Sequence, residues 1–246
     1  MRLRAFARVI VLLLFVGSIA LASRVERLID TWRPTHYLVN ITLNDQLSEI
    51  TSASARIYLT IVKPTRELDI DFGELTIDRV TLAERSYEFH RKNGKIHIDL
   101  PQAASPGDPY ILEVFYHGKP KDGLILSNDK DGKPSAIGDN WPDRVHHWIP
   151  VLDHPSAKAT VTFNITAPAG QEVIANGRLD HVETTASGQR TWTYSEGVPI
   201  PPYCMIIGVG QFAKFDLGQQ KPTQISYYVP LSERDLAVKG FLPAMP

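Results

Sequence analysis

Two adjacent histidines, His146 and His147, are the first residues whose type suggests chemistry, because imidazole nitrogens bind metals and exchange protons near neutral pH. Successive side chains of a strand point to opposite faces, so a strand would not direct both rings at one metal ion. The remaining six of the eight histidines have no carboxylate at the spacing of a metal site. We therefore expect structural or surface histidines and no metal-binding residue in this chain.

A second pattern of chemical interest runs from Ser127 to Lys130 and fits the S-x-x-K arrangement, in which a lysine lies beside a serine nucleophile. That arrangement needs a helix, whereas these residues lie in a polar stretch flanked by glycine. Asp129, Asp131 and Gly132 also resemble the start of a calcium-binding loop, but no glutamate follows at the twelfth position of that loop. The sequence therefore predicts a plain turn here.

Other signatures of catalysis are missing from the sequence. It contains no H-E-x-x-H, no G-x-S-x-G, no P-loop, no G-x-G-x-x-G and no Cys/His spacing typical of zinc sites. The single cysteine, Cys204, lies in an apolar run and predicts a buried, inert thiol. We predict no catalytic residue in this chain and no cofactor bound by it.

The segment 139–160 is unusually dense in prolines, tryptophans and charged residues. Prolines restrict the backbone, tryptophans bury large side chains, and aspartates beside them are usually paired or cap turns. Two interpretations remain open. The segment is either a rigid structural crossover that joins two sheets or the wall of a cleft.

The elements that must position this segment are strands, because apolar and polar residues alternate from Thr35 onward, as in Tyr37, Val39 and Ile41. Such runs recur about every ten residues, which is typical of antiparallel sandwiches and barrel-like sheets. The polar stretch 117–147 predicts a long loop. We therefore predict an all-β fold. The pairs that predict tight hairpin turns are Asn93-Gly94, Asn176-Gly177 and Ser187-Gly188.

Composition and charge indicate no nucleic-acid partner. Of the 246 residues, 43% are hydrophobic and 22% are charged, as in ordinary globular domains. The 26 basic and 27 acidic residues give a formal net charge of −1. Neither a basic surface nor an acidic tail is indicated by this balance.

The first residues form a targeting pattern. Arg2, Arg4 and Arg8 precede an apolar run, 9–22, which ends in the small-x-small order of a signal-peptide cleavage site. A membrane span needs about 20 apolar residues and this run has fourteen, so cleavage is favoured over an uncleaved anchor. We predict an exported protein, periplasmic or extracellular, with a membrane-anchored form if the signal is not cleaved.

The last residues have a helical pattern. Ser232, Asp235 and the apolar run 236–238 indicate the capped start of a helix. The chain ends soon afterwards, at Pro246. We interpret this segment as the start of a following helical domain that is cut off.

Three motifs carry a resemblance to a known family. The segment 148–160, W-I-P-V-L-D-H-P-S-A-K-A-T, resembles the W-F-P-C-x-D-E-P-x-x-K-A-T pattern of aminopeptidase N and leukotriene hydrolase, a family of zinc peptidases. The segments 172–177 and 203–212 are similar to later strands of that family, and the resemblance covers about 35–246. Its structural motif falls on Trp148, Pro150, Asp153, Pro155 and Lys158.

Some positions depart from the family pattern. Val151 stands where the family has cysteine, and His154 stands where it has glutamate. Upstream, relatives have a T-Q-x-E element whose Gln or Glu side chain faces the amino end of the substrate. Asp139 and Trp141 occupy that place here, so the usual side chains are absent. The resemblance leaves Asp139 or Asn140 as the substrate-binding replacement.

The resemblance implies a saddle-like β domain of antiparallel sheets that packs on a thermolysin-like catalytic domain. It also implies that the intact family uses zinc to release N-terminal residues from peptides, with the peptide N-terminus as a partner. The family's G-x-M-E-N and H-E-x-x-H elements belong to the catalytic domain and are absent here. The implied organisation is a signal peptide over 1–22, a leader over 23–34, the β domain over 35–230 and the truncated start of the catalytic domain over 231–246.

Two functional hypotheses follow. In the first, the chain is the non-catalytic N-terminal domain of an exported zinc aminopeptidase and is inactive alone. In the second, it is a stand-alone exported β-sandwich that binds a carbohydrate or peptide. An H-E-x-x-H element encoded downstream of Pro246 would favour the first hypothesis.

Overall fold

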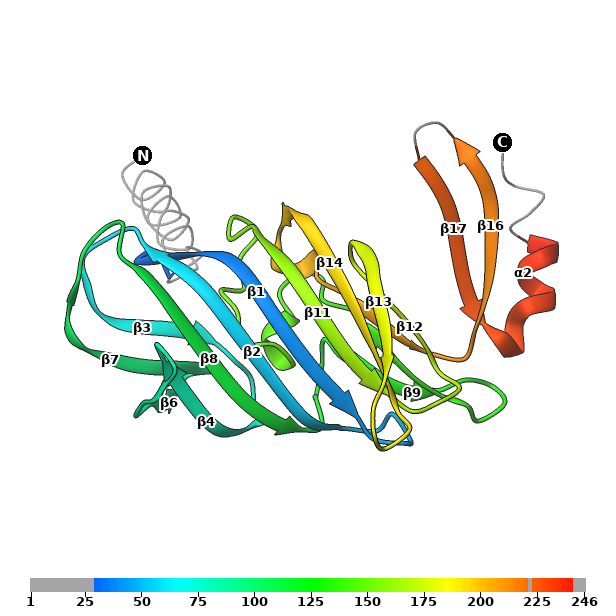
Figure 1. Ribbon diagram of the computed structural model, residues 1–246, viewed down its shortest axis with the longest axis horizontal. Helices are drawn as coiled ribbons and strands as arrows, with labels where there is room; N and C mark the ends of the chain where they lie inside the picture. Colours follow the sequence, from blue (N-terminus) through cyan, green and yellow to red (C-terminus); the bar gives the residue numbers. More distant parts are fainter. Residues whose placement is uncertain (1–28, 221–222, 241–246) are drawn as a thin grey trace, which may run out of the picture.

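The computed structural model describes residues 29–220 and 223–240, and the predicted signal peptide lies outside these residues. Within them, no helix is long and apolar enough to cross a bilayer. The described part of the chain consists mostly of strands (Figure 1), so the prediction of an all-β fold is confirmed.

One large sheet runs across the main body of the molecule (Figure 1). Its strands are β1 (Trp32–Leu43), β2 (Ile50–Ile61), β4 (Thr76–Leu82), β5 (Arg85–Ser86), β8 (Pro109–Gly118), β11 (Ala159–Ala167), β13 (Arg178–Thr184) and β14 (Arg190–Ile200), in the order β13-β14-β11-β1-β2-β8-β4-β5. All neighbours in this sheet are antiparallel except β1 and β11, which pair in parallel from His36↔Thr160 to Thr42↔Thr166. The parallel pair departs from the purely antiparallel prediction, because alternation marks which face is buried and not which strand is the neighbour.

Two smaller sheets cover one face of the large sheet. The first contains β9 (Leu124–Asn128), β10 (Pro134–Gly138), β12 (Glu172–Ala175) and β15 (Ile207–Gly210), in the order β12-β15-β10-β9. The second contains β3 (Thr65–Asp71), β6 (His90–Lys92) and β7 (Lys95–Ala104), in the order β3-β7-β6. Short 3-10 helices η1 (Val145–His147) and η2 (Pro202–Cys204) connect strands.

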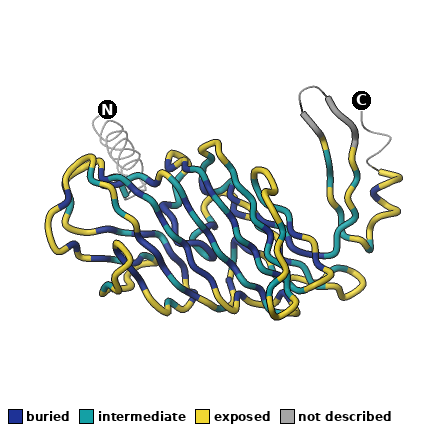
Figure 2. The backbone as a smooth tube through the Cα atoms, viewed as in Figure 1, coloured by how far each residue is buried: buried dark blue, intermediate teal, exposed yellow. Residues whose placement is uncertain are grey.

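The core lies between the large sheet and the smaller sheets. On β1, Tyr37, Val39 and Ile41 are at most 1% exposed, while the residues between them are half-buried. Figure 2 shows the same alternation of buried and less buried residues along the neighbouring strands. Burial of each large apolar side chain contributes about 1.5–3 kcal/mol, so this alternation provides much of the driving force for folding.

The predicted loop 117–147 is wrong as a single loop, because it contains β9, β10 and η1. The two strands give a weak sequence signal, since they have only five residues each and little alternation. The turn that joins them is the predicted plain turn: the Asp129 carboxylate accepts hydrogen bonds from the backbone N–H groups of Asp131 (2.9 Å) and Lys133 (2.8 Å).

Two of the three predicted hairpin turns are confirmed. Asn93-Gly94 joins β6 to β7 with φ values of 53° and 71°, and Gly188 (φ 83°) lies in the turn between β13 and β14. The third is wrong, because Gly177 (φ 86°) carries the chain from β12 in one sheet to β13 in another.

The last elements stand beside the main body in Figure 1. They are the hairpin of β16 (Phe212–Gln220) and β17 (Thr223–Pro230), then η3 (Leu231–Glu233) and α2 (Arg234–Gly240). The predicted helix start therefore coincides with η3 and α2, while residues 241–246 lie outside the described part. The assignment of 231–246 to a further domain stays a prediction.

Candidate functional site

The candidate site is the segment 139–158, which leaves β10 and crosses between the two smaller sheets. At its start the Asp139 N–H donates to the Gly123 carbonyl (2.7 Å). Further on, Val151 and Asp71 exchange two backbone hydrogen bonds of 3.1 and 2.9 Å, which fix the segment to the end of β3. Backbone bonds thus hold the segment at its start and at Val151, and the structure supports the interpretation of a rigid crossover.

Asn140 lies near the start of this crossover and is only 2% exposed. Its Nδ2 donates to the Met205 carbonyl (2.6 Å), and its Oδ1 accepts from Nε1 of the fully buried Trp148 (2.8 Å). Both ends of the amide are therefore occupied inside the protein. This geometry makes Asn140 a positioning residue that ties the crossover to the segment before β15.

Asp139 differs from its neighbour because its side chain is 55% exposed. Arg144 lies between two carboxylates, with Nη1 at 3.4 Å from Asp139 Oδ2 and 3.2 Å from Asp122 Oδ1. Burial alone would raise the pKa of Asp122, but the Gly123 N–H and Arg144 outweigh it and lower that pKa. Of the two predicted substrate-binding residues, Asp139 is the one that a ligand can reach, and its role stays a prediction.

Sequence reasoning gave no binding role to the aromatic pair beside Asp139. Trp141 is 64% exposed, and its ring meets the Tyr203 ring edge-on, with centroids 5.1 Å apart. An indole this exposed is unusual in a segment that is otherwise fixed, and it offers an apolar and cation-binding face to a ligand. The sequence signal was a tryptophan between a polar residue and a proline, which fitted a core anchor equally well.

His146 and His147 lie in η1, so the prediction made from strand geometry does not apply to them. Their rings are side by side, with centroids 4.2 Å apart. Nδ1 of His146 is bonded to Asp153 Oδ2 (2.8 Å), and the Asp153 side chain is only 5% exposed. In the described residues no group of three or more His, Cys, Asp or Glu side chains could hold a metal ion.

The family-like motif divides into an inner and an outer part. Trp148 and Pro150 are buried. Asp153 forms three hydrogen bonds: its Oδ2 accepts from the backbone N–H and from the ring of His146, and its own N–H donates to Asp71 Oδ2 (3.0 Å). Pro155 and Lys158 are exposed. The inner residues therefore fix the crossover, whereas the outer ones lie on the surface before β11.

The His146–Asp153 contact predicts a pH-dependent stability. Burial lowers the pKa of His146, but the hydrogen bond and charge of Asp153, with Asp71 and Asp143 nearby, outweigh burial and raise that pKa above its usual 6.5. A raised pKa in the folded state stabilises the fold fully below about pH 6.5, and this contribution is lost as pH rises through the folded value. Burial and the adjacent His146 lower the pKa of His147, so it opposes this trend.

We expect the His146→Gln variant to lose more stability relative to the unmodified chain at about pH 5.5 than at about pH 8 in urea denaturation. Glutamine keeps a hydrogen-bond donor near Asp153 but carries no charge. His90→Gln is the matched control, since His90 is exposed on β6 and its side chain makes no hydrogen bond within the described residues. An equal loss at both pH values would contradict the proposed charge interaction.

Comparison with known proteins identifies the family of this chain. A protein-family model described as Peptidase M1 N-terminal domain matches residues 33–204. Leucine aminopeptidase 2 of Pyricularia oryzae is 23% identical over 205 residues, which cover 77% of this chain and 33% of that protein. Probable aminopeptidase 1 of Saccharolobus solfataricus is 25% identical over 167 residues, which cover 66% of this chain and 21% of that protein. The chain thus spans a third or less of these relatives.

Solved structures share the fold. The M1 zinc metallopeptidase of Deinococcus radiodurans superposes with a TM-score of 0.70 at 19% sequence identity, covering 85% of this chain and 52% of that chain. A variant of that enzyme bound to a Tyr-Ser-Ala substrate has a TM-score of 0.69 at 20% identity. The family match covers most of the chain, including β1 and the crossover. The chain therefore belongs to the Peptidase M1 N-terminal domain family.

Proposed function

We propose that this chain is the non-catalytic N-terminal domain of an exported zinc aminopeptidase and forms one wall of its substrate cleft. The observation that carries the proposal is the rigid crossover: Asn140 and Asp153 fix a segment from which Trp141 and Asp139 project to solvent. A carboxylate beside an aromatic face suits the ammonium group at the start of a peptide.

Zinc would be supplied by another domain. The solved structures that share this fold are those of zinc metallopeptidases, yet within the described residues no cluster of His, Cys, Asp and Glu fits a metal ion. A zinc site needs three or four such ligands converging on one point. The purified chain should accordingly hold no stoichiometric zinc and release no amino acid from aminoacyl anilides.

A catalytic domain would dock on the apolar side of the smaller sheet β12-β15-β10-β9. A groove of about 260 Å³ lies between this sheet and the terminal hairpin, and Ile137, Ile206, Phe212 and Tyr228 are among its lining residues. Ile137, Ile206 and Tyr228 are each about 40% exposed. Apolar side chains gathered on one surface are typical of a face that packs on another domain.

The cleft-wall role is tested by titrating the chain with the tripeptide Tyr-Ser-Ala and following backbone amide NMR shifts. We expect saturable shifts at residues 139–141, 143–144 and 203, weaker with the N-acetylated peptide and with Asp139→Asn. Asp143→Asn is the matched control, because Asp143 is an exposed carboxylate of the same segment that forms no ion pair within the described residues. Equal shifts from the free and acetylated peptides would contradict recognition of the ammonium group.

We also propose export, on the basis of Arg2, Arg4 and Arg8 before the apolar run 9–22. The mature protein is then expected to begin near Ser23 and to lie outside the cytoplasmic membrane. N-terminal sequencing of the protein from its native host checks this. Recovery of soluble cytoplasmic protein that still begins at Met1 would refute it.

A further inference from the structure

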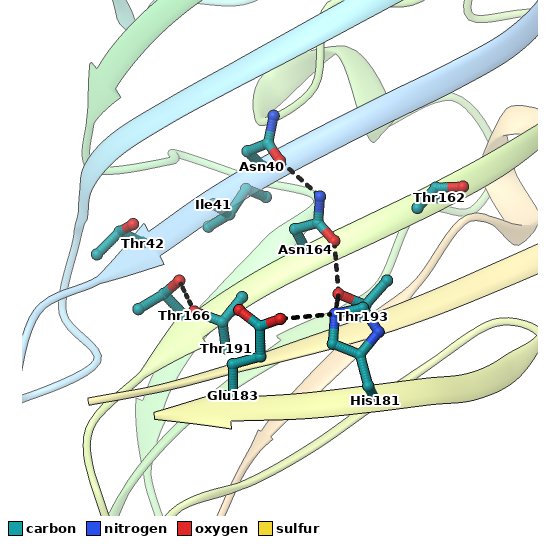
Figure 3. A pocket seen from close by; sticks show the side chains of 10 residues that line it. All are labelled: Asn40, Ile41, Thr42, Thr162, Asn164, Thr166, His181, Glu183, Thr191 and Thr193. Carbon is teal, nitrogen blue, oxygen red and sulfur yellow. Dashed lines mark hydrogen bonds and ion pairs between the residues drawn. The ribbon is translucent and has the colours of Figure 1, made fainter. Parts of the chain in front are cut away.

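The outer face of the large sheet carries a pocket that the cleft-wall role does not use (Figure 3). Its volume is about 490 Å³, and its lining comprises five threonines, two asparagines, one histidine, one glutamate and Ile41. The side chain of Asn40 lies on the face opposite the core, since its neighbours on β1, Val39 and Ile41, are buried. We call the nine polar residues of this lining the polar stripe.

A chain of hydrogen bonds runs along the polar stripe across neighbouring strands (Figure 3). Asn164 Nδ2 donates to Asn40 Oδ1 (2.8 Å), and Thr193 Oγ1 donates to Asn164 Oδ1 (2.8 Å). At one end of this series, Asn40 Nδ2 donates to Ser54 Oγ on β2 (2.9 Å). At the other end, Thr193 Oγ1 is hydrogen-bonded to His181 Nε2 on β13 (3.3 Å). These bonds fix the orientation of both amides, so the stripe is organised before any ligand arrives.

The fixed groups still have unused hydrogen-bonding capacity. Each amide has two N–H donors and two acceptor lone pairs, and the bonds of the stripe use one of each on Asn40 and on Asn164. The hydroxyl groups of Thr42 and Thr162 make no hydrogen bond within the described residues, although both line the pocket. The pocket therefore presents both hydrogen-bond donors and acceptors to a ligand.

Charge narrows the class of ligand. The lining contains no lysine or arginine, and its one carboxylate, Glu183 Oε1, lies 3.3 Å from His181 Nε2. Phosphates and carboxylates normally require arginine, lysine or a run of backbone N–H groups. A neutral ligand whose groups both donate and accept hydrogen bonds fits better, and hydroxyl groups have this property.

The polar stripe also differs from the rest of the same face. Further along the sheet, Arg56 and Glu113 form an ion pair (2.8 Å), and the Arg79 guanidinium lies over the Phe115 ring (4.1 Å). Long charged side chains of this kind are the common covering of a solvated sheet. The stripe replaces them with short threonine and asparagine side chains, and their shortness leaves the hollow.

We propose that the polar stripe binds a carbohydrate, a short neutral oligosaccharide laid across β1, β11, β14 and β13. The volume lies in the range of small-ligand sites, and a lining that offers both donors and acceptors suits sugar hydroxyl groups. His181 provides the one ring in the lining, so little stacking is available and binding is weak, with a Kd on the order of 1 mM. The proposal does not rest on the cleft-wall role.

The test is an NMR titration of the full chain with maltohexaose, cellohexaose and N-acetylchitohexaose, each followed to about 20 mM, well above the expected Kd. At least one of them should give saturable shifts at the backbone amides of β11 and β14. Thr162→Val should weaken that binding by about threefold to tenfold, the loss of one hydrogen bond. This variant keeps the shape of the side chain and breaks no bond inside the protein.

Thr60→Val is the matched control, because Thr60 lies on β2 away from the pocket and its side chain makes no hydrogen bond within the described residues. It should bind like the unmodified chain. No saturable shift with any of the three sugars would overturn the proposal, and so would shifts confined to residues outside the stripe. Equal weakening by Thr162→Val and Thr60→Val would overturn it as well.

Discussion

Replacing Asn140 by alanine is expected to lower the free energy of unfolding by about 2–4 kcal/mol, because two buried polar groups lose their partner. These groups are the Met205 carbonyl and the Trp148 indole N–H, at 2.6 and 2.8 Å from the amide. Asn140 is 2% exposed, so water does not readily replace the amide. Urea denaturation followed by tryptophan fluorescence measures the loss.

Asn128→Ala is the control for this experiment, since Asn128 is exposed at the end of β9 and its side chain makes no hydrogen bond within the described residues. Its effect should stay within about 0.5 kcal/mol. Trp148→Phe removes the indole N–H, and the double variant with Asn140→Ala should lose about 0.5–3 kcal/mol less than the sum of the single losses. An Asn140→Ala loss no larger than that of Asn128→Ala would contradict the positioning role.

The strand pattern and the family resemblance were accessible from the sequence for a physical reason. Alternation along β1 reflects a local property, the two faces of a single strand, and it placed Tyr37, Val39 and Ile41 in the core correctly. The motif around Trp148 and Asp153 was equally accessible, because it is contiguous in the chain. The fold class and the segment that carries the family motif were therefore predictable.

The contacts that define the site were not predictable, because they join distant parts of the chain. Asn140 bonds to a carbonyl 65 residues away, and that partner decides whether the amide faces a ligand or the interior. The parallel pairing of β1 with β11 likewise has no signature in either strand. The polar stripe was not predictable for the same reason, because the hydrogen bond between Asn164 and Asn40 depends on that pairing.

The second large effect is expected from Gly123→Ala. Gly123 has φ +75°, and a Cβ added there would lie 2.1 Å from the Arg144 carbonyl oxygen and 2.8 Å from Cδ1 of Trp148. The variant should therefore lose about 2–5 kcal/mol, which combines the strain of alanine in the left-handed region with overpacking. Urea denaturation measures this loss as well.

Gly132→Ala separates the two causes, because Gly132 has the same φ of +75° and nothing lies within 4 Å of its added Cβ. Its loss should be about 1–2 kcal/mol, the strain alone. The excess at Gly123 then reports how tightly the crossover packs at Arg144 and Trp148. Since Trp148 also bonds to Asn140, displacement of its ring by the new methyl group should change the near-UV circular dichroism of Gly123→Ala and leave that of Gly132→Ala unchanged. Equal losses in both variants would mean that the Arg144 carbonyl and Trp148 can move aside, and the crossover would then not be rigid enough to hold a fixed cleft wall.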